Sequence, residues 1–135
     1  MNRPVTAEDA VHAETQAAVA DFMDTFNRGE LEPILALYTE NCIMIAPGRS
    51  IVRDKAALRD FWRTMLEDVG MGEVEYEIEQ IDVYDADNAL ETTRFSATVG
   101  GVRQTGNYIV QWKREDGRLK LHRDIFTAVP VGGGA

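Results

Sequence analysis

The spacing of apolar residues changes near Glu73, and this change limits the possible folds more than any other feature of the chain. Before Glu73, apolar residues recur every three or four positions, which is typical of helices. After it, they alternate with polar residues, as in strands with one buried face. A chain of 135 residues in which helices precede strands is expected to form one α+β domain. We place that domain at residues 1–130 and expect the glycine-rich segment 131–135 to be a flexible tail.

Three helices are predicted in the first half of the chain. Thr6 can cap the first, and Gly29 can end it. Pro33 suits the first turn of a short second helix, and Asp54 can cap a third. The apolar faces of these helices include Phe22, Phe26, Ile34, Leu35, Tyr38, Leu58, Phe61, Trp62, Met65 and Leu66.

Strands are predicted at residues 42–46 and from Glu73 onward. The apolar alternation changes phase between Ile78 and Ile81, which indicates a β-bulge that bends the strand. Three further strands at 89–99, 102–114 and 118–127 are separated by turn sequences typical of antiparallel hairpins. We therefore predict a cone-shaped, curved antiparallel sheet wrapped round three N-terminal helices, with one pocket for a small apolar molecule.

Charge and composition exclude several classes of partner. The chain carries 23 acidic and 14 basic side chains, a formal net charge of −9, so it repels nucleic acid and anionic membrane surfaces. Its longest apolar run, 42–46, is too short to cross a bilayer. Cys42 is the only cysteine, is expected to be a small core residue, and allows no internal disulfide. We therefore expect a cytoplasmic protein.

Several segments resemble the nuclear transport factor 2-like superfamily, and within it the SnoaL-like, ketosteroid isomerase-like branch. They read FNRGEL at 26–31, LALYTEN at 35–41, ALRDFW at 57–62, YIVQWKREDGR at 108–118 and RDIF at 123–126. The resemblance covers about residues 12–127. It implies a conical α+β barrel that usually dimerises through the outer sheet face and holds its ligand between helices and sheet. It implies little about activity, because this fold carries many.

The resemblance also allows known catalytic positions to be checked one at a time. Ketosteroid isomerase has a carboxylate base at the end of the first strand, where this chain has Ala46, and a tyrosine donor on the first helix, where it has Phe22. Its second donor falls at Tyr108. The Arg-x-Asp pair of limonene-epoxide-hydrolase-like members has no match, because the strand reads Arg103-Gln104-Thr105. The known route of steroid isomerisation is therefore not expected.

The last strand carries the preferred polar pair. His122, Asp124 and Phe126 share one face, which the resemblance turns toward the pocket. His122 or Asp124 could move a proton, and Tyr108 could stabilise developing charge. Two alternatives stay open: His122 could face solvent, and Asp124 could pair with an arginine such as Arg94 or Arg123.

Strand parity alone favours the opposite orientation, because Leu119, Leu121 and Ile125 form the more apolar face. The two interpretations agree if those residues cover the interface of a homodimer.

The remaining side chains that we expect at the pocket are aromatic, sulfur-containing or apolar, with one arginine. Each of the aromatic and Met residues could equally be simple core. The expected ligand-binding set is Phe22, Tyr38, Met44, Trp62, Met65, Arg94, Val110, Trp112 and Phe126. We expect no metal, because only His12 and His122 exist and neither has a partner at ligand spacing. No phosphate loop or dinucleotide motif is present, so no cofactor is expected.

Three functions remain open. The first is a cofactor-independent isomerase, cyclase or lyase that acts by proton transfer on a small apolar substrate. The second is a ligand-binding module without turnover, which Ala46 and Phe22 favour. The third is a domain that mainly dimerises.

Overall fold

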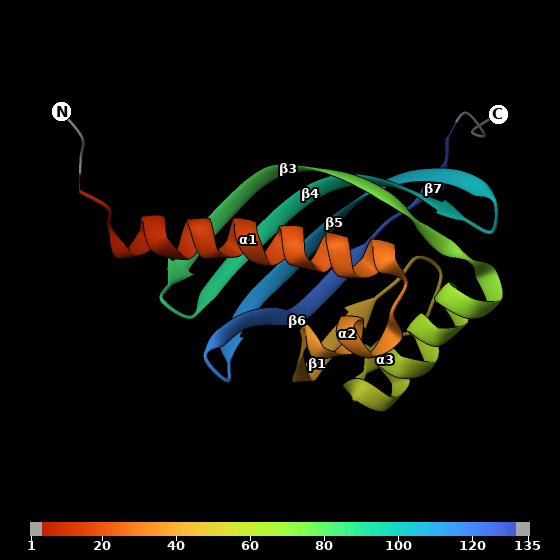
Figure 1. Cartoon of the computed structure of the whole chain (residues 1–135), viewed down its shortest axis with the longest axis horizontal. Helices are drawn as coiled ribbons and strands as arrows, with labels where there is room; N and C mark the ends of the chain where they lie inside the picture. Colours follow the sequence, from red (N-terminus) through yellow and green to blue (C-terminus); the bar gives the residue numbers. More distant parts are fainter. Residues whose placement is uncertain (1–3, 132–135) are drawn as a thin grey trace.

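The computed structural model describes residues 4–131, which form helices followed by one sheet (Figure 1). The helices are α1 (Ala7–Arg28), α2 (Leu31–Ala36) and α3 (Asp54–Arg63), and α3 continues as a π-helix, η1 (Thr64–Val69). The strands are β1 (Tyr38–Ile45), β2 (Val52–Arg53), β3 (Met71–Asp85), β4 (Asn88–Val99), β5 (Val102–Glu115), β6 (Arg118–Phe126) and β7 (Val129–Pro130).

The strands form one curved sheet in the order β2-β1-β6-β5-β4-β3, and β7 pairs with β5. The pairs from β3 to β6 are antiparallel, as predicted, whereas β1 lies parallel to β6. Helix α1 runs along the concave side, and α2 and α3 lie near β1 (Figure 1). The predicted α+β class and the curved sheet around N-terminal helices are confirmed.

Local sequence signals fix the ends of the helices. Thr6 and Asp9 form a capping box, in which each side chain accepts a hydrogen bond from the other's backbone N–H. Gly29 ends α1 in the left-handed conformation, with φ of 69°. The Asp54 carboxylate accepts the N–H of Ala57 at 3.0 Å, so it caps α3 as predicted.

Two boundaries differ from the sequence prediction. Tyr38 is not on the second helix but is the first residue of β1, four residues before the predicted start of that strand. The sheet competes successfully for this backbone, because the Leu37 carbonyl accepts the N–H of Leu121 at 2.8 Å. The third helix also loosens into η1 before Gly70, whose N–H donates to the Met65 carbonyl five residues earlier.

The bulge predicted in the first long strand is present in β3. Ile78 pairs with Thr93 and Gln80 with Thr92, so Glu79 is the extra residue. Strand β3 lies at the edge of the sheet, and the acidic residues Glu73, Glu75 and Glu77 are exposed along it. Charge on an edge strand discourages pairing with other chains.

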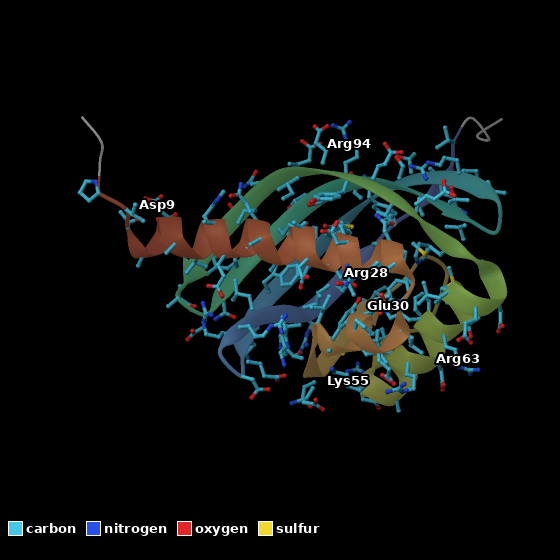
Figure 2. The ribbon with its side chains drawn as sticks, viewed as in Figure 1. Asp9, Arg28, Glu30, Lys55, Arg63 and Arg94 are labelled. Carbon is cyan, nitrogen blue, oxygen red and sulfur yellow. The ribbon has the colours of Figure 1, made fainter. Side chains whose placement is uncertain are left out.

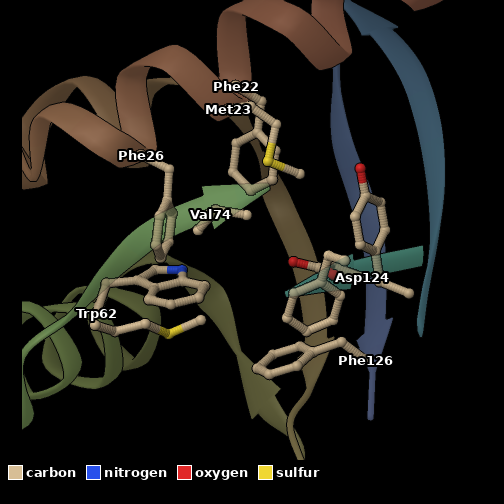
Figure 3. A pocket seen from close by; sticks show the side chains of 10 residues that line it. Phe22, Met23, Phe26, Trp62, Val74, Asp124 and Phe126 are labelled. Atoms are coloured by element: carbon tan, nitrogen blue, oxygen red, sulfur yellow. The ribbon is translucent and has the colours of Figure 1, made fainter. Parts of the chain in front are cut away.

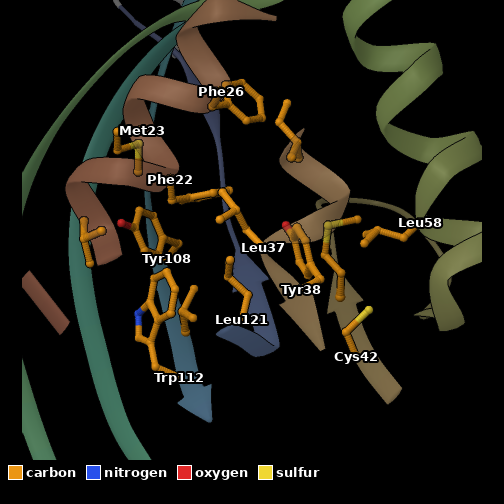
Figure 4. Close-up of a cluster of buried hydrophobic side chains, with 14 of the residues drawn as sticks. Phe22, Met23, Phe26, Leu37, Tyr38, Cys42, Leu58, Tyr108, Trp112 and Leu121 are labelled. Carbon is orange, nitrogen blue, oxygen red and sulfur yellow. The ribbon is translucent and has the colours of Figure 1, made fainter. Parts of the chain in front are cut away.

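One cluster of buried side chains joins α1 to the concave face (Figure 4). Phe22 contacts Tyr38 and Trp112 in edge-to-face geometry, with ring centroids 6.4 and 6.5 Å apart. Cys42 is buried in this cluster, as predicted.

Val131 donates its backbone N–H to the Arg103 carbonyl, and the rest of the predicted tail, 132–135, lies outside the described residues. Within residues 4–131, no helix is long and apolar enough to cross a membrane.

Gly106 in β5 generates a prediction about stability. A Cβ atom there would lie 1.7 Å from the Thr127 carbonyl oxygen, which is backbone and cannot turn aside. We expect Gly106→Ala to lower the free energy of unfolding by at least about 1–3 kcal/mol. Gly72→Ala in β3 is the matched control, because its Cβ would meet nothing within 4 Å. Denaturant titration measures both, and equal losses for the two variants would contradict the prediction.

Candidate functional site

A small cavity lies between α1, α3 and the concave face of the sheet (Figure 3). The centres of water molecules can occupy about 40 Å³ of the cavity. The whole space between the protein atoms there, including the open mouth, is about 410 Å³. Its walls are aromatic or aliphatic apart from Asp124 and the phenol of Tyr108. The residues that line it are Phe22, Met23, Phe26, Trp62, Met71, Val74, Phe95, Tyr108, Asp124 and Phe126.

Asp124 is the only carboxyl among the described residues that line the cavity, and it is only 5% exposed. Burial raises its pKa to about 7, and the charge of Glu91 acts in the same direction. The Tyr38 hydroxyl donates to Asp124 Oδ2 at 2.8 Å, which opposes the rise. Arg94 and Arg123 have other partners, so the alternative in which an arginine pairs with Asp124 is excluded. Near neutral pH both protonation states of this carboxyl are therefore populated.

A bulge in β6 turns Asp124 into the cavity. Trp112 pairs with Leu121 and Gln111 with Arg123, so His122 is an extra residue in β6. Before the bulge, Leu119 and Leu121 are buried in the core, and after it, Asp124 and Phe126 line the cavity. The apolar face expected from strand parity is therefore the buried face in the first half of β6, and the polar face expected from the resemblance lines the cavity in the second half. The idea that Leu119 and Leu121 cover a dimer interface is wrong, because both are core residues.

His122 does not line the cavity. Its Nδ1 shares a hydrogen bond of 2.8 Å with the Thr39 hydroxyl, and the side chain is partly buried. Burial lowers the pKa of His122, and the positive charges of Arg123 and Lys113 lower it further. The bulge therefore separates His122 from Asp124, although they lie two residues apart.

Tyr108 lines the cavity, but its hydroxyl proton is directed away from it, to Glu91. Glu91 is fully buried and also accepts hydrogen bonds from the Thr93 hydroxyl and, at 2.8 Å, from Trp112 Nε1. Burial raises the pKa of Glu91, and its three donors oppose that rise. Burial and the neighbouring Glu91 charge also raise the pKa of Tyr108, so its phenol is neutral.

Sequence analysis missed Glu91, although one signal was available. It shares strand parity with Ala89, Phe95 and Ala97, all of which are buried. An acidic residue at an inward position needs hydrogen-bond donors, and two of the three donors to Glu91, Tyr108 and Trp112, come from the neighbouring strand β5. Glu91 pairs with Val110, and Val110 with Asp124, so the two acids occupy one row of the sheet, with their backbones about 10 Å apart.

The other predicted ligand-binding residues divide into three groups. Phe22, Trp62 and Phe126 line the cavity. Arg94 does not: it is exposed on the outer side of the sheet, where it pairs with Glu77 and Glu79 (Figure 2). The residues that lie in or against the core without lining the cavity are Tyr38, Met44, Met65, Val110 and Trp112.

The described residues offer no metal site, because no three His, Cys, Asp or Glu side chains among them are placed to hold one ion. Ala46, at the end of the first strand, is buried and supplies no base. The cavity is therefore an apolar chamber with one titrating acid, which reaches it from β6.

Comparison with solved structures shows the same fold in proteins of low sequence identity. A ketosteroid isomerase-like protein from Erwinia carotovora atroseptica SCRI1043 aligns with a TM-score of 0.77 and 21% identity, covering 87% of this chain and 95% of that one. An NTF-2 like protein of unknown function from Shewanella oneidensis MR-1 gives 0.72 and 16%, covering 85% and 97%. A hexachlorocyclohexane dehydrochlorinase gives 0.70 and 13%, covering 94% and 93%.

A search of curated proteins finds no match. The sequence profile of the SnoaL-like domain, however, matches residues 19–122, which is most of the chain and includes α3 and the strands from β1 to β5. The chain therefore belongs to the SnoaL-like domain family, within the nuclear transport factor 2-like superfamily.

Proposed function

We propose that this protein is a cofactor-independent enzyme that moves a proton on a small, largely apolar organic substrate, with Asp124 as the general acid or base. The observation that carries the proposal is a carboxyl with a pKa of about 7 in the wall of an apolar cavity. Proton transfer is most efficient when the pKa of the catalytic group lies near the working pH. An ordinary surface aspartate, with a pKa near 3.8, would be too weak a base.

The surroundings of Asp124 suit this role. Tyr38 holds one carboxyl oxygen and leaves the other without a partner among the described residues. Asp124 is only 5% exposed among apolar walls, so its carboxylate is less solvated and its interaction with a bound molecule is stronger than in water. His122, which we expected as a second proton carrier, faces Thr39 and takes no part in this proposal.

The structural neighbours support a reaction of this kind. The name dehydrochlorinase describes removal of hydrogen chloride, in which a base takes a proton from carbon. This chain has neither a carboxylate at Ala46 nor a hydroxyl at Phe22, so an isomerase arrangement like that of the steroid enzymes is not proposed. The alternative is a binding module without turnover, in which Asp124 serves only to orient the ligand.

We also propose that a second copy of this chain covers part of the outer sheet face. Ile109 and Ile125 are cross-strand partners there, and they are 43% and 46% exposed. Neighbouring apolar residues on an exposed sheet face can form part of an association surface. This proposal replaces the interface predicted to include Leu119 and Leu121.

The catalytic proposal predicts that Asp124→Asn abolishes turnover, with a loss of at least about a hundredfold, because the amide cannot exchange a proton. The measurement is product formation with a panel of small ketones and halogenated hydrocarbons. Asp24→Asn is the control, since Asp24 is an exposed aspartate on α1. If Asp124→Asn keeps the wild-type rate on a substrate of the panel, Asp124 is not the acid or base. If the wild type binds panel compounds and turns over none of them, the binding-module alternative holds.

The raised pKa of Asp124 also predicts how stability depends on pH. Between about pH 4 and 7 the folded state keeps a proton that the unfolded state has lost, so stability falls as pH rises, by up to about 1.4 kcal/mol per pH unit. Asp124→Asn should remove this contribution. Tyr38→Phe removes a hydrogen bond that lowers the Asp124 pKa, so it should extend the decline to higher pH. Denaturant titrations at several pH values test this, and parallel curves for wild type and Asp124→Asn would refute it.

The dimer proposal predicts that Ile109→Lys weakens self-association by at least about tenfold, because it places a charge within the apolar pair. Sedimentation velocity at increasing protein concentration measures the change. Ile51→Lys, at another exposed isoleucine away from that pair, should leave it unaltered. A wild-type monomer at all concentrations would exclude the interface.

A further inference from the structure

Six of the side chains that line the cavity are aromatic, and they form a continuous series that we call the aromatic belt (Figure 3). They come from α1, α3, β4, β5 and β6, so the rings reach the cavity from both helices and from the sheet. The centroids of neighbouring rings are 5.0 to 6.4 Å apart. From neighbour to neighbour, the members of the belt are Tyr108, Phe95, Phe126, Trp62, Phe26 and Phe22.

The rings of the aromatic belt are tilted against one another, so their faces point in several directions. The angle between ring planes is 12° for Trp62 and Phe126, 48° for Tyr108 and Phe95, and 67° to 82° for the other three pairs. The face of an aromatic ring carries partial negative charge, and a cation within about 6 Å of the ring centre is attracted to it. Because water centres occupy only about 40 Å³, a bound group would lie within this distance of several rings.

The charged groups at the cavity are acids. None of the described lining residues is a lysine, arginine or histidine. Asp124 lines the cavity, and the fully buried Glu91 lies in the same row of the sheet. A carboxylate or phosphate would enter beside these two acids with no cation to balance it, which is costly in a buried site. A cation would instead be attracted by both the acids and the aromatic belt.

Asp124 has one oxygen that a cation could face. The Tyr38 hydroxyl donates to Oδ2, and the other oxygen has no partner among the described residues. The side chain is only 5% exposed, so water compensates little of its charge when it is ionised. A positive group in the cavity would stabilise the carboxylate form.

Four titratable side chains among the described residues interact electrostatically with Asp124, and none of them supplies positive charge. Burial and the charge of Asp124 raise the pKa of Tyr38 on β1 and of Tyr108 on β5, so both phenols stay neutral. Burial also raises the pKa of the Cys42 thiol on β1. Glu91 on β4 is an acid, and α1 and α3 contribute only apolar and aromatic side chains to the wall.

We propose that the cavity binds a substituted ammonium ion, whose apolar groups contact the aromatic belt and whose positive charge faces the oxygen of Asp124 that Tyr38 leaves without a partner. This inference rests on the proposed function, because it names the substrate class of the same site: molecules with an apolar body and an ammonium group. A round space with this volume of water centres is about 7 Å wide once the radius of a water molecule is added. That width suits a nitrogen atom that carries methyl groups, and the rest of the molecule extends toward the mouth.

The test compares choline with 3,3-dimethylbutan-1-ol, in which a carbon atom replaces the charged nitrogen. The two probes share one shape and one hydroxyl group, and the charge of choline does not change with pH. At pH 8, where Asp124 is mostly ionised, we expect choline to bind at least about tenfold more tightly. Isothermal titration calorimetry measures both affinities. Equal affinities, tighter binding of the alcohol, or no binding of choline would overturn the proposal.

Proton release provides a second readout, which a purely apolar cavity would not give. A cation beside Asp124 favours the carboxylate, so choline binding at pH 7 should release up to about half a proton, and the alcohol should release none. Calorimetry in two buffers of different ionisation enthalpy measures this number. The release should vanish in Asp124→Asn. Release that persists in this variant, or no release from the wild type, would count against the proposal.

The contribution of the aromatic belt is tested with Phe126→Leu, which removes one ring. This change should lower the ratio of choline affinity to alcohol affinity by about threefold, because one attraction between cation and ring is lost. Met23→Leu is the matched control: Met23 lines the same cavity without an aromatic ring, so the ratio should stay unchanged. Equal effects of the two variants on the ratio would contradict a role for the belt. If Phe126→Leu does not fold, the comparison of the two probes on the wild type decides.

Failure of this inference can be told apart from failure of the proposed function. If choline is preferred and releases a proton, but Asp124→Asn retains turnover of a substrate, the catalytic role of Asp124 fails and the ammonium site stands. If Asp124→Asn abolishes turnover of a neutral compound but choline is not preferred to the alcohol, the ammonium site fails alone.

Discussion

One extra residue in the last long strand controls both the core and the cavity. Strand side chains alternate between two faces, so a regular β6 could bury either Leu121 or Asp124, but not both. The bulge at His122 shifts the alternation by one position. The first half of β6 thereby completes the core against Trp112, and the second half presents an acid to the cavity. The packing of the domain and its candidate chemistry therefore depend on the same local irregularity.

The two buried carboxyls in this row of the sheet differ in what surrounds them. Glu91 has three donors and no place in the cavity wall, so it serves to hold Tyr108 and Trp112. Asp124 has one donor and an apolar space in front of it. Different surroundings give two neighbouring carboxyls different pKa values, so one can serve a structural role while the other exchanges protons. The charge of Glu91 also helps to raise the pKa of Asp124, so the structural acid supports the reactive one.

Sequence patterns predicted whatever depends on neighbours along the chain. Thr6, Gly29 and Asp54 end helices through contacts within a few residues, and the phase change around Glu79 is a local property of β3. The features that sequence analysis missed depend on distant partners. Tyr38 enters a strand because the backbone at Leu121 pairs with it, and the β6 bulge is visible only in the register against β5. Asp124 lines the cavity, whereas the bulge turns His122 to Thr39, so the predicted pair does not share one face.

The absence of an acid at Ala46 argues against one mechanism, not against catalysis. In this curved sheet β1 and β6 are neighbours, and Met44 pairs with Asp124. An acid on β6 can therefore reach nearly the same space that an acid at the end of β1 would reach. Phe22 contributes a wall in place of a donor, while Tyr38, on β1, donates a hydrogen bond to the acid that lines the cavity. In such a fold, whether a functional group can act on a ligand depends less on its position in the sequence than on whether its strand or helix forms a wall of the cavity.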